Sequence, residues 1–255
     1  MAKSNLTSKR NLSKHNFEST LQQRVNEKIS KYVINSNEID KSMRYALANP
    51  GKRVRPLLCY LVGDALNLDL KILDGTASAI EIIHTYSLVH DDLPCMDNDD
   101  LRRGKPTLHV KYSESTAVLA GDAMASLAID IILQDKKLNS DLKVELLKLL
   151  MKTIGPEGMI LGQIQDISFE NQSVTEKQII KMNELKTGAL VEFSMLAPVI
   201  IAGKKISKWK EIAKRIGITF QLIDDLLDIQ ESKESLGKAA NKDKKKNKKN
   251  YPICF

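Results

Sequence analysis

The segment ASAIEIIHTYSLVHDDLPCMDNDD, residues 77–100, decides the fold class. Its first half, up to Val89, is apolar on more than one side, which is typical of a helix in the centre of a core. Pro94 disfavours helical geometry at the residue before it, so the helix should end or bend there. A six-residue spacing does not put Asp91 and Asp97 on one helix face, but a bend at Pro94 could bring Asp97 back toward Asp91.

Helical periodicity extends outward from this segment over most of the chain. Apolar residues recur three or four positions apart at Leu21, Val25 and Ile29, at Ala79, Ile83 and Tyr86, and at Leu142, Leu146 and Leu149. Glycines and prolines gather at plausible breaks, which are Pro50-Gly51, Gly104 to Pro106, and Gly155-Pro156. We therefore predict an all-α fold, a single-domain bundle of long helices over residues 16–240.

The net charge of +7 resides mainly in one short segment. Residues 242–249, KDKKKNKK, hold six lysines and one aspartate, which is +5, and leave about +2 for the rest of the chain. This distribution argues against nucleic acid as a partner. Residues 1–15 predict a flexible basic N-terminus, and residues 241–255 predict a lysine-rich tail that is disordered or degenerate.

Cysteine content and hydropathy predict a cytoplasmic protein. The chain has three cysteines, an odd number, and no CxxC spacing, which favours a reduced protein without disulfides or a zinc site. There is no run of about 18 apolar residues, so we predict no membrane span. Residues 1–15 lack the apolar stretch of a secretory signal.

A second acidic motif, FQLIDDLLD, occupies residues 220–228. Asp224 and Asp228 are four apart and share one helix face, where like charges repel. The apolar flanks, which are Leu222, Ile223, Leu226 and Leu227, predict that the segment is buried. Buried carboxylates need a compensating cation, and hard oxygen ligands without His or Cys suit Mg²⁺. Two acidic motifs far apart in the sequence suggest a diphosphate held between them by several ions.

Three basic segments could meet the charge of such a diphosphate. They are GKRVRP at residues 51–56, RRGK at residues 102–105 and KTG at residues 186–188. The forked guanidinium of arginine suits phosphate oxygens, and lysine acts as a point charge. The chain has no GxxxxGK[ST] sequence, which excludes a P-loop nucleotide site.

Together these motifs resemble the trans-prenyltransferase, or polyprenyl synthase, family, and most closely its bacterial farnesyl diphosphate synthases. The matching stretches are GKRVRP, residues 84–107, GDA at 121–123, GQIQD at 162–166, KTG and FQLIDDLLD. They occur in the family's order and approximate spacing between about residue 20 and about residue 240. The resemblance implies the isoprenoid synthase fold, in which long helices surround a central substrate cavity.

The resemblance also assigns roles to single residues. It implies Mg²⁺, as two or three ions, bound by Asp91 and Asp97, with Asp92 adjacent, and by Asp224, with Asp225 and Asp228 supporting. The residues that hold or flank the allylic substrate would be Arg102, Lys186, Thr187, Gln221 and Lys238. The pocket for the diphosphate of isopentenyl diphosphate would comprise Lys52, Arg55, His84 and Arg103. The residues most directly engaged in catalysis would be Asp91, Asp92, Asp97, Arg102, Lys186 and Asp224.

The implied reaction condenses isopentenyl diphosphate with dimethylallyl or geranyl diphosphate to give farnesyl diphosphate. Metal ions and cations would stabilise the departing diphosphate, where negative charge grows in the transition state. The double bond of isopentenyl diphosphate would then attack the allylic carbocation. The family is thought to use the departing diphosphate as the base, which agrees with the lack of an obvious protein base in this sequence.

Product length in the family depends on the pocket floor below the first acidic motif. Tyr86 lies five residues before Asp91, and an aromatic side chain there would block chains longer than fifteen carbons. Simple core packing is the other interpretation of Tyr86. The sequence DDLPCMDNDD also resembles geranylgeranyl diphosphate synthases, so that activity is the alternative.

After Lys238 the match to the family decays. Where the family has a GKxTYP segment, this chain has NKKNYP at residues 247–252, and we expect the last helices of the fold to be missing. The alternative is therefore a non-catalytic or defunct partner subunit of a prenyl synthase, against which both complete acidic motifs argue. The family resemblance implies a homodimer, and no stable membrane insertion is expected.

Two other classes of enzyme fit the sequence less well. The pair His90-Asp91 suggests an HD-type phosphohydrolase, but the chain has only four histidines and none at a suitable spacing. A terpene cyclase would share the first acidic motif but would ordinarily carry an Asn/Ser/Glu pattern in place of FQLIDDLLD.

Overall fold

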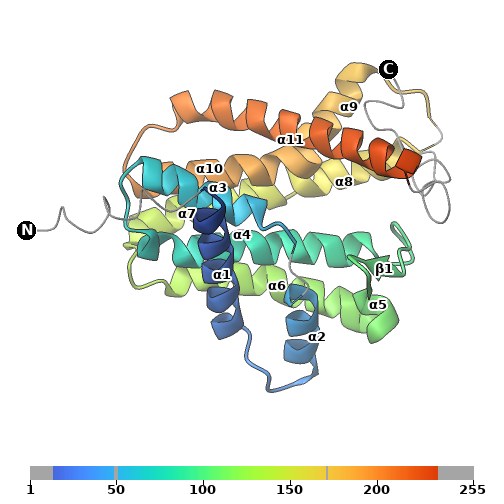
Figure 1. Cartoon of the computed structure of the whole chain (residues 1–255), viewed down its shortest axis with the longest axis horizontal. Coiled ribbons are helices and arrows are strands. Elements are labelled where there is room, and N and C mark those ends of the chain that lie inside the picture. The colour runs from blue at the N-terminus through green and yellow to red at the C-terminus, as the bar shows by residue number, and fades with distance from the viewer. Residues whose placement is uncertain (1–13, 49–50, 171, 235–255) are drawn as a thin grey trace, which may run out of the picture. The chain divides into compact units, whose positions relative to one another are not determined.

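The computed structural model describes residues 14–48, 51–170 and 172–234 (Figure 1). It divides into two compact units, with the boundary between Asp135 and Lys136, and each unit is described by itself. The prediction of an all-α fold is confirmed, because the strands among the described residues comprise four residues in all. The single helical domain over residues 16–240 stays a prediction.

The described residues of the first unit form six helices and a short hairpin. Their bounds are α1 Lys14–Tyr32, α2 Glu38–Leu47, α3 Val54–Ala65, α4 Leu70–Asp91, β1 Leu101–Arg102, β2 Lys105–Pro106, α5 Leu108–Lys111 and α6 Glu114–Gln134. Helix α4 is central: it lies beside α6 and also packs against α3 and α1 (Figure 1). Every residue from Leu73 to Ile83 is buried, as the apolar pattern of this segment predicts.

Local sequence signals set where these helices begin. The side chains of Asn37, Asp69 and Ser113 each accept a hydrogen bond from a backbone N–H in the first turn of α2, α4 and α6. Such caps satisfy donors that would otherwise lack a partner inside the helix. The break predicted at Pro50-Gly51 falls between α2 and α3, although Pro50 itself lies outside the described residues.

The hairpin β1–β2 is closed by a two-residue turn. Leu101 pairs with Pro106 and Arg102 with Lys105, which leaves Arg103 and Gly104 in the turn. Both turn residues have a positive φ, 53° and 76°, as a type I′ turn requires. The break predicted at Gly104 to Pro106 is therefore a tight reversal of the chain that follows the first acidic motif.

The second unit contains the remaining described helices. Their bounds are α7 Ser140–Ile154, α8 Met159–Ser168, α9 Glu176–Asn183, the π-helix η2 Glu184–Gly188, α10 Ala189–Ile201 and α11 Ser207–Glu234. Helix α10 is the core, with every residue from Phe193 to Ile201 buried, and α11 and α7 pack against it (Figure 1). The predicted break at Gly155-Pro156 separates α7 from α8.

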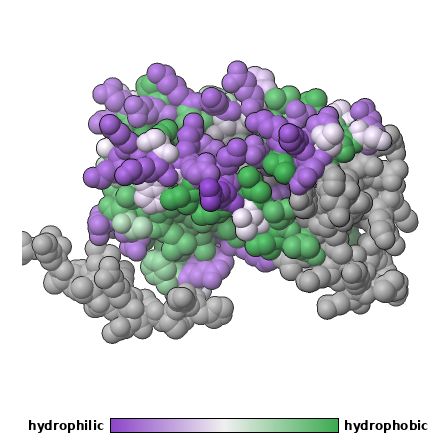
Figure 2. All heavy atoms as spheres, turned by 90° about the horizontal axis from the view of Figure 1, so that it is seen from above, coloured by the Kyte–Doolittle hydropathy of each residue, from purple (hydrophilic) through white to green (hydrophobic). Residues whose placement is uncertain are grey.

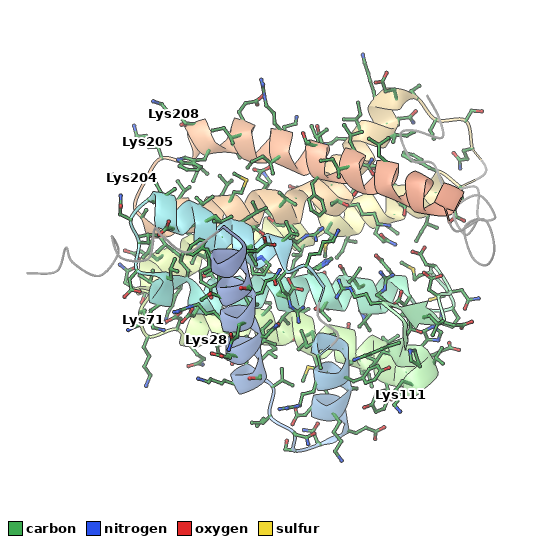
Figure 3. The ribbon with its side chains drawn as sticks, viewed as in Figure 1. Lys28, Lys71, Lys111, Lys204, Lys205 and Lys208 are labelled. Atoms are coloured by element: carbon green, nitrogen blue, oxygen red, sulfur yellow. The ribbon has the colours of Figure 1, made fainter. Side chains whose placement is uncertain are left out.

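Both hydrophilic and hydrophobic residues reach the surface on the face shown in Figure 2, where hydrophilic ones predominate. Exposed lysines contribute to this character, and Lys204, Lys205 and Lys208 gather at the start of α11 (Figure 3). Among the described helices, α6 has the length and apolar composition needed to cross a membrane. It also carries Asp122 and Asp130 and packs along α4, as a core helix of the first unit does.

Candidate active site

The first acidic motif folds back on the end of α4. The helix ends at Asp91, and the Asp97 N–H donates a hydrogen bond to the Asp91 carbonyl at 2.8 Å. The N–H of Asn98, which has a φ of 50°, donates to the Leu93 carbonyl at 3.0 Å. The bend predicted at Pro94 is thus confirmed, and it brings the backbones of Asp91 and Asp97 together.

Asp92 of this motif forms an ion pair with Arg102. Asp92 is only 3% exposed, and its carboxylate accepts hydrogen bonds from Nε and Nη2 of Arg102, the shortest at 2.6 Å. Burial raises the pKa of Asp92, and the adjacent guanidinium of Arg102 opposes this shift. A forked pair of this kind fixes the position of the arginine. Sequence reasoning placed both residues in the site but did not pair them.

The donor chemistry of the first motif fits Mg²⁺. Magnesium takes one or two carboxylates and completes its shell with water and phosphate oxygens. Asp91 and Asp97 provide two carboxylates from one folded loop, while Asp92 is engaged by Arg102. No group of three or more His, Cys, Asp or Glu side chains within the described part of the chain could hold a metal ion by itself.

The four residues predicted to bind isopentenyl diphosphate lie in one part of the first unit. Nη1 of Arg55 is 3.3 Å from Nε2 of His84. The guanidinium of Arg103 covers Gly51, where an added Cβ would lie 2.3 Å from Nη2. Lys52 follows Gly51 and is exposed. Arg102 and Arg103 are adjacent at the β1–β2 turn, yet Arg102 contacts Asp92 and Arg103 contacts Gly51.

His84 is neutral in this cluster. Burial, followed by the positive charges of Arg55 and Arg103, lowers the pKa of His84 well below its ordinary value. Because an arginine can only donate, Nε2 of His84 accepts from Arg55 and the ring proton lies on Nδ1. The cluster can therefore meet an anion with the charges of its arginines and lysine, while His84 orients Arg55.

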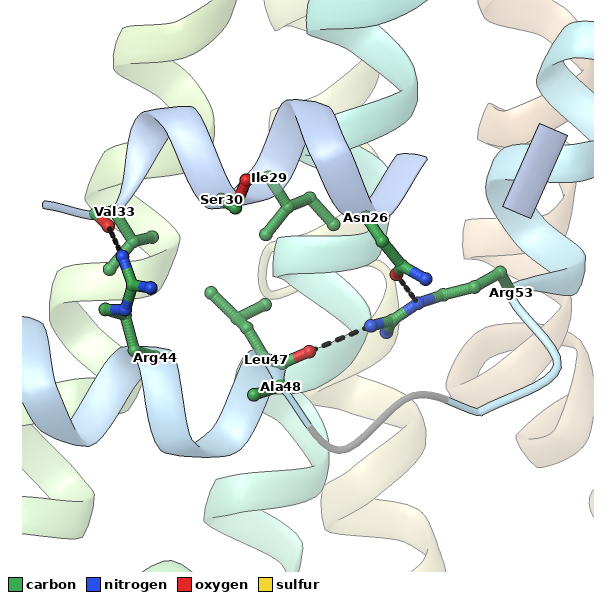
Figure 4. A pocket seen from close by; sticks show the side chains of 8 residues that line it. All are labelled: Asn26, Ile29, Ser30, Val33, Arg44, Leu47, Ala48 and Arg53. Carbon is green, nitrogen blue, oxygen red and sulfur yellow. Dashed lines mark hydrogen bonds between the residues drawn. The ribbon is translucent and has the colours of Figure 1, made fainter. Parts of the chain in front are cut away.

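Arg53 is a residue of this region that sequence reasoning passed over. It is 5% exposed, and its guanidinium donates to Asn26 Oδ1 at 3.0 Å, to the Leu47 carbonyl at 2.8 Å and to Glu81 Oε1 at 2.6 Å. It also forms part of the wall of a pocket of about 250 Å³ between α1 and α2 (Figure 4). The signal in the sequence was Glu81, a carboxylate within the apolar stretch 77–83, which needs a buried partner.

Lys186 and Thr187 lie on the π-helix η2 of the second unit. Nζ of Lys186 donates to Oδ2 of Asp166, the last residue of the GQIQD motif, at 2.5 Å. Glycines on two neighbouring helices let the η2 backbone approach closely: a Cβ on Gly162 would lie 2.3 Å from the Lys186 nitrogen, and one on Gly217 would lie 3.0 Å from the Gly188 Cα. Single π-helical turns frequently occur at functional sites.

The second acidic motif lies on α11, where the structure places Asp224, Asp225 and Asp228. The side chains of these three aspartates, and Lys238 as a whole, lie outside the description. Gln221 is partly exposed. The prediction of a buried segment is wrong for two of its flanks, because Ile223 is 49% and Leu226 is 52% exposed. Sequence alone could not distinguish an apolar face that is covered from one that is open.

Tyr86 is held at the α4–α6 contact. Its ring meets the ring of His90 edge to face, with centroids 5.8 Å apart, and His90 Nε2 is 3.0 Å from the Val118 carbonyl on α6. Burial, assisted by the charge of Asp91, raises the pKa of Tyr86 to about 12. The phenol is therefore neutral, and it lies one and a half turns before the first acidic motif.

Comparisons with known proteins concern the chain as a whole. The family model for polyprenyl synthetase matches residues 36–255. A farnesyl diphosphate synthase from Geobacillus stearothermophilus is 39% identical over 96% of this chain and 85% of that protein. Geranylgeranyl pyrophosphate synthase 4 from Arabidopsis thaliana is 42% identical over 86% of this chain, which spans 60% of that protein.

A solved structure extends the likeness to the fold. The geranyltransferase from Helicobacter pylori, complexed with magnesium and isoprenyl diphosphate, has a TM-score of 0.77 and 35% identity to this chain. The match covers 86% of this chain and 77% of that one. The family model and these levels of identity show that the chain belongs to the polyprenyl synthetase family of trans-prenyltransferases.

Proposed function

We propose that this chain is a Mg²⁺-dependent farnesyl diphosphate synthase, which joins isopentenyl diphosphate to dimethylallyl and then geranyl diphosphate and releases diphosphate. The observation that carries the proposal is the cation cluster of the first unit. Arg55 and Arg103 gather there around a neutral His84, beside the exposed Lys52. Such a cluster suits the diphosphate of isopentenyl diphosphate.

The allylic diphosphate is assigned to other residues. When bound, two or three Mg²⁺ ions neutralise the charge that grows on the leaving diphosphate. The proposed ligands are Asp91, Asp97, Asp224 and Asp228, with Asp225 supporting. The proposed cations and polar groups at the allylic diphosphate are Arg102, Lys186, Thr187, Gln221 and Lys238.

The order of bond changes follows from these assignments. The bond between C1 of the allylic chain and the diphosphate oxygen breaks, the isopentenyl double bond forms the new carbon–carbon bond, and a proton leaves to the released diphosphate. We assign the stabilisation of this anion to Arg102, which pairs with Asp92, and to Lys186, which pairs with Asp166. The family match supports this reaction class.

Fifteen carbons is the product length we propose, with geranylgeranyl diphosphate as the alternative. Relatives of both kinds have similar identity to this chain, 39% for the farnesyl and 42% for the geranylgeranyl synthase. The aromatic ring of Tyr86, which contacts His90 edge to face, favours the shorter product, because its bulk would stop a longer chain.

A homodimer in the cytoplasm belongs to the same proposal. Helix α6 exposes three large apolar side chains, Val118, Leu119 and Leu133, each more than 40% accessible, and such surface is typical of an interface. Cys59 and Cys95 are free thiols, as in a reducing compartment. Sedimentation velocity on the wild type and on Leu119→Lys should give a dimer and a weakened dimer, respectively.

Product analysis tests the function directly. The purified chain is incubated with isopentenyl and dimethylallyl diphosphates, with and without Mg²⁺, and the prenyl products are sized by chromatography. A fifteen-carbon product that requires Mg²⁺ is expected. A twenty-carbon product would favour the geranylgeranyl alternative, and no product under any condition would favour a non-catalytic or defunct partner subunit.

A further inference from the structure

Arg53 is anchored by three helices at once. Asn26 of α1, the Leu47 carbonyl at the end of α2 and Glu81 of α4 each accept one hydrogen bond from its guanidinium, and two of these bonds are drawn in Figure 4. A lysine has a single nitrogen and could not span all three acceptors in this fork. The side chain therefore ties the segment before α3 to the rest of the first unit.

The backbone of Arg53 is strained and needs such an anchor. Its φ is 52° and its ψ is 32°, the left-handed region, which residues with a side chain rarely adopt. Conformations of this kind persist only where the surroundings enforce them, and they gather at functional sites. Without its hydrogen bonds, we expect Arg53 to relax to an ordinary conformation and to move the residues on both sides.

Glu81 is the buried counterpart of Arg53. It is 1% exposed, its Oε1 accepts from Arg53, and its Oε2 makes no hydrogen bond in the structure. Burial lowers the pKa of Arg103, and the negative charge of Glu81 opposes that shift. Glu81 thus acts on two arginines of the same region without being exposed to a substrate itself.

The residues on either side of Arg53 belong to the cation cluster. Lys52 precedes it, Arg55 follows two positions later and contacts His84, and Arg103 lies over Gly51. A displacement of residues 51–55 would therefore move Lys52 and Arg55 directly and change the contact of Gly51 with Arg103.

We propose that Arg53 and Glu81 are a positioning pair for isopentenyl diphosphate: their buried ion pair holds residues 51–55 so that Lys52, Arg55 and Arg103 converge on the diphosphate. The inference rests on the proposed function, but it concerns residues that do not touch the substrate. The inference predicts different effects on the two substrates. The pair supports the basic side chains assigned to isopentenyl diphosphate and not the groups assigned to the allylic diphosphate.

Steady-state kinetics with each substrate varied in turn tests the pair. The variants are Glu81→Gln and Arg53→Lys, with Asn26→Ala as a milder change that removes one hydrogen bond and is expected to fold. Loss of a charge-assisted hydrogen bond predicts a KM for isopentenyl diphosphate raised by about tenfold in the first two variants. The KM for the allylic diphosphate should stay within about twofold of wild type, a change of less than about 0.5 kcal/mol.

Asp74→Asn is the matched control. Asp74 also lies on α4 and is 2% exposed, but its carboxylate is paired with Arg24 at 2.6 Å, Lys28 at 3.0 Å and Tyr60 at 2.9 Å instead of Arg53. Its replacement should lower the melting temperature, as the loss of a buried ion pair does, and leave the ratio of the two KM values unchanged. A general loss of stability would affect both KM values in the same way in the control and in the test variants.

Each outcome decides between the inference and the proposed function. The positioning pair is overturned if a folded Glu81→Gln or Arg53→Lys variant raises both KM values or leaves both unchanged. If neither variant folds, Asn26→Ala decides by the same criterion. If the wild type makes no product, the proposed function fails, and calorimetric binding of isopentenyl diphosphate to the same variants tests the pair. A wild type that neither reacts nor binds overturns both.

Discussion

Neighbouring residues with the same chemistry acquire different roles here through their partners. Arg102 and Arg103 are adjacent, yet the first is held by Asp92 and the second covers Gly51. The positive φ of Arg103 and Gly104 in the hairpin turn makes this separation possible. Arg53 and Arg55 differ in the same way, since Arg53 forms an ion pair with Glu81 and Arg55 contacts His84.

His84 should make the stability of the fold depend on pH. Its pKa in the folded state is lowered, so the unfolded chain binds the proton more readily, and stability falls as the pH drops below the unfolded value of about 6.5. His84→Gln removes this titration. The stability difference between wild type and variant should change by up to about 1.4 kcal/mol per pH unit below that pH and level off above it.

Urea unfolding of wild type and His84→Gln between about pH 5 and pH 8 measures the difference in their free energies of unfolding. This range extends about one and a half pH units to each side of the ordinary histidine pKa. Other groups titrate equally in the two proteins and cancel. A difference that is independent of pH would mean that His84 is not held neutral in the fold.

Tyr86→Ala should lengthen the product. The substitution removes the aromatic ring one and a half turns before Asp91 and leaves space that extra prenyl units could fill. Chromatographic sizing should show products beyond fifteen carbons. Tyr86→Phe keeps the ring and should keep the wild-type length; if the alanine variant also keeps it, the assignment of Tyr86 to the pocket floor is wrong.

At the scale of elements, a π-helix carries the Lys186-Thr187 pair between two helices that approach it through glycine. A Cβ on Gly162 of α8 would lie 2.3 Å from the η2 backbone, which leaves no room for it, and one on Gly217 of α11 would lie 3.0 Å away, a tight contact. Backbone atoms cannot swing aside as a flexible side chain can. The position of Lys186 is therefore set by how closely α8 packs against η2.

Gly162→Ala should displace η2 and weaken the allylic site. The new Cβ would lie 2.3 Å from the Lys186 nitrogen, and overpacking of this kind typically costs about 1–3 kcal/mol of stability. The KM for the allylic diphosphate should rise more than that for isopentenyl diphosphate, whose residues lie in the first unit. Kinetics with each substrate varied, together with urea unfolding, measures both effects.

Gly188→Ala is the control for the effect of alanine itself. A Cβ there would meet only the Asn183 carbonyl oxygen at 3.6 Å, an ordinary contact, so stability should be unchanged or slightly higher. Equal destabilisation by both substitutions would contradict the close packing of α8 on η2.

For the whole molecule, the proposed function uses two ways of binding a diphosphate. The cations of the first unit are part of the chain itself, whereas the acidic motifs require added metal ions to meet an anion. Removal of Mg²⁺ with a chelator should therefore abolish condensation and leave isopentenyl diphosphate binding largely intact.

Calorimetry with isopentenyl diphosphate and product assays, each before and after chelation, check this expectation. Restoring Mg²⁺ should restore the product and serves as the control for damage by the chelator. Full activity without Mg²⁺, or loss of isopentenyl diphosphate binding on its removal, would contradict the division of roles.

The sequence by itself determined the helical fold, the breaks at glycine and proline, and the bend that returns Asp97 to Asp91. These features follow from periodicity and backbone restrictions that act within a few residues. Only the tertiary structure decided that Arg53 is buried on Glu81, that Asp92 pairs with Arg102, and that Ile223 is exposed. Which residue pairs with a charged side chain, and whether an apolar helix face is buried, depend on contacts with residues distant in the chain. A local sequence pattern does not contain this information.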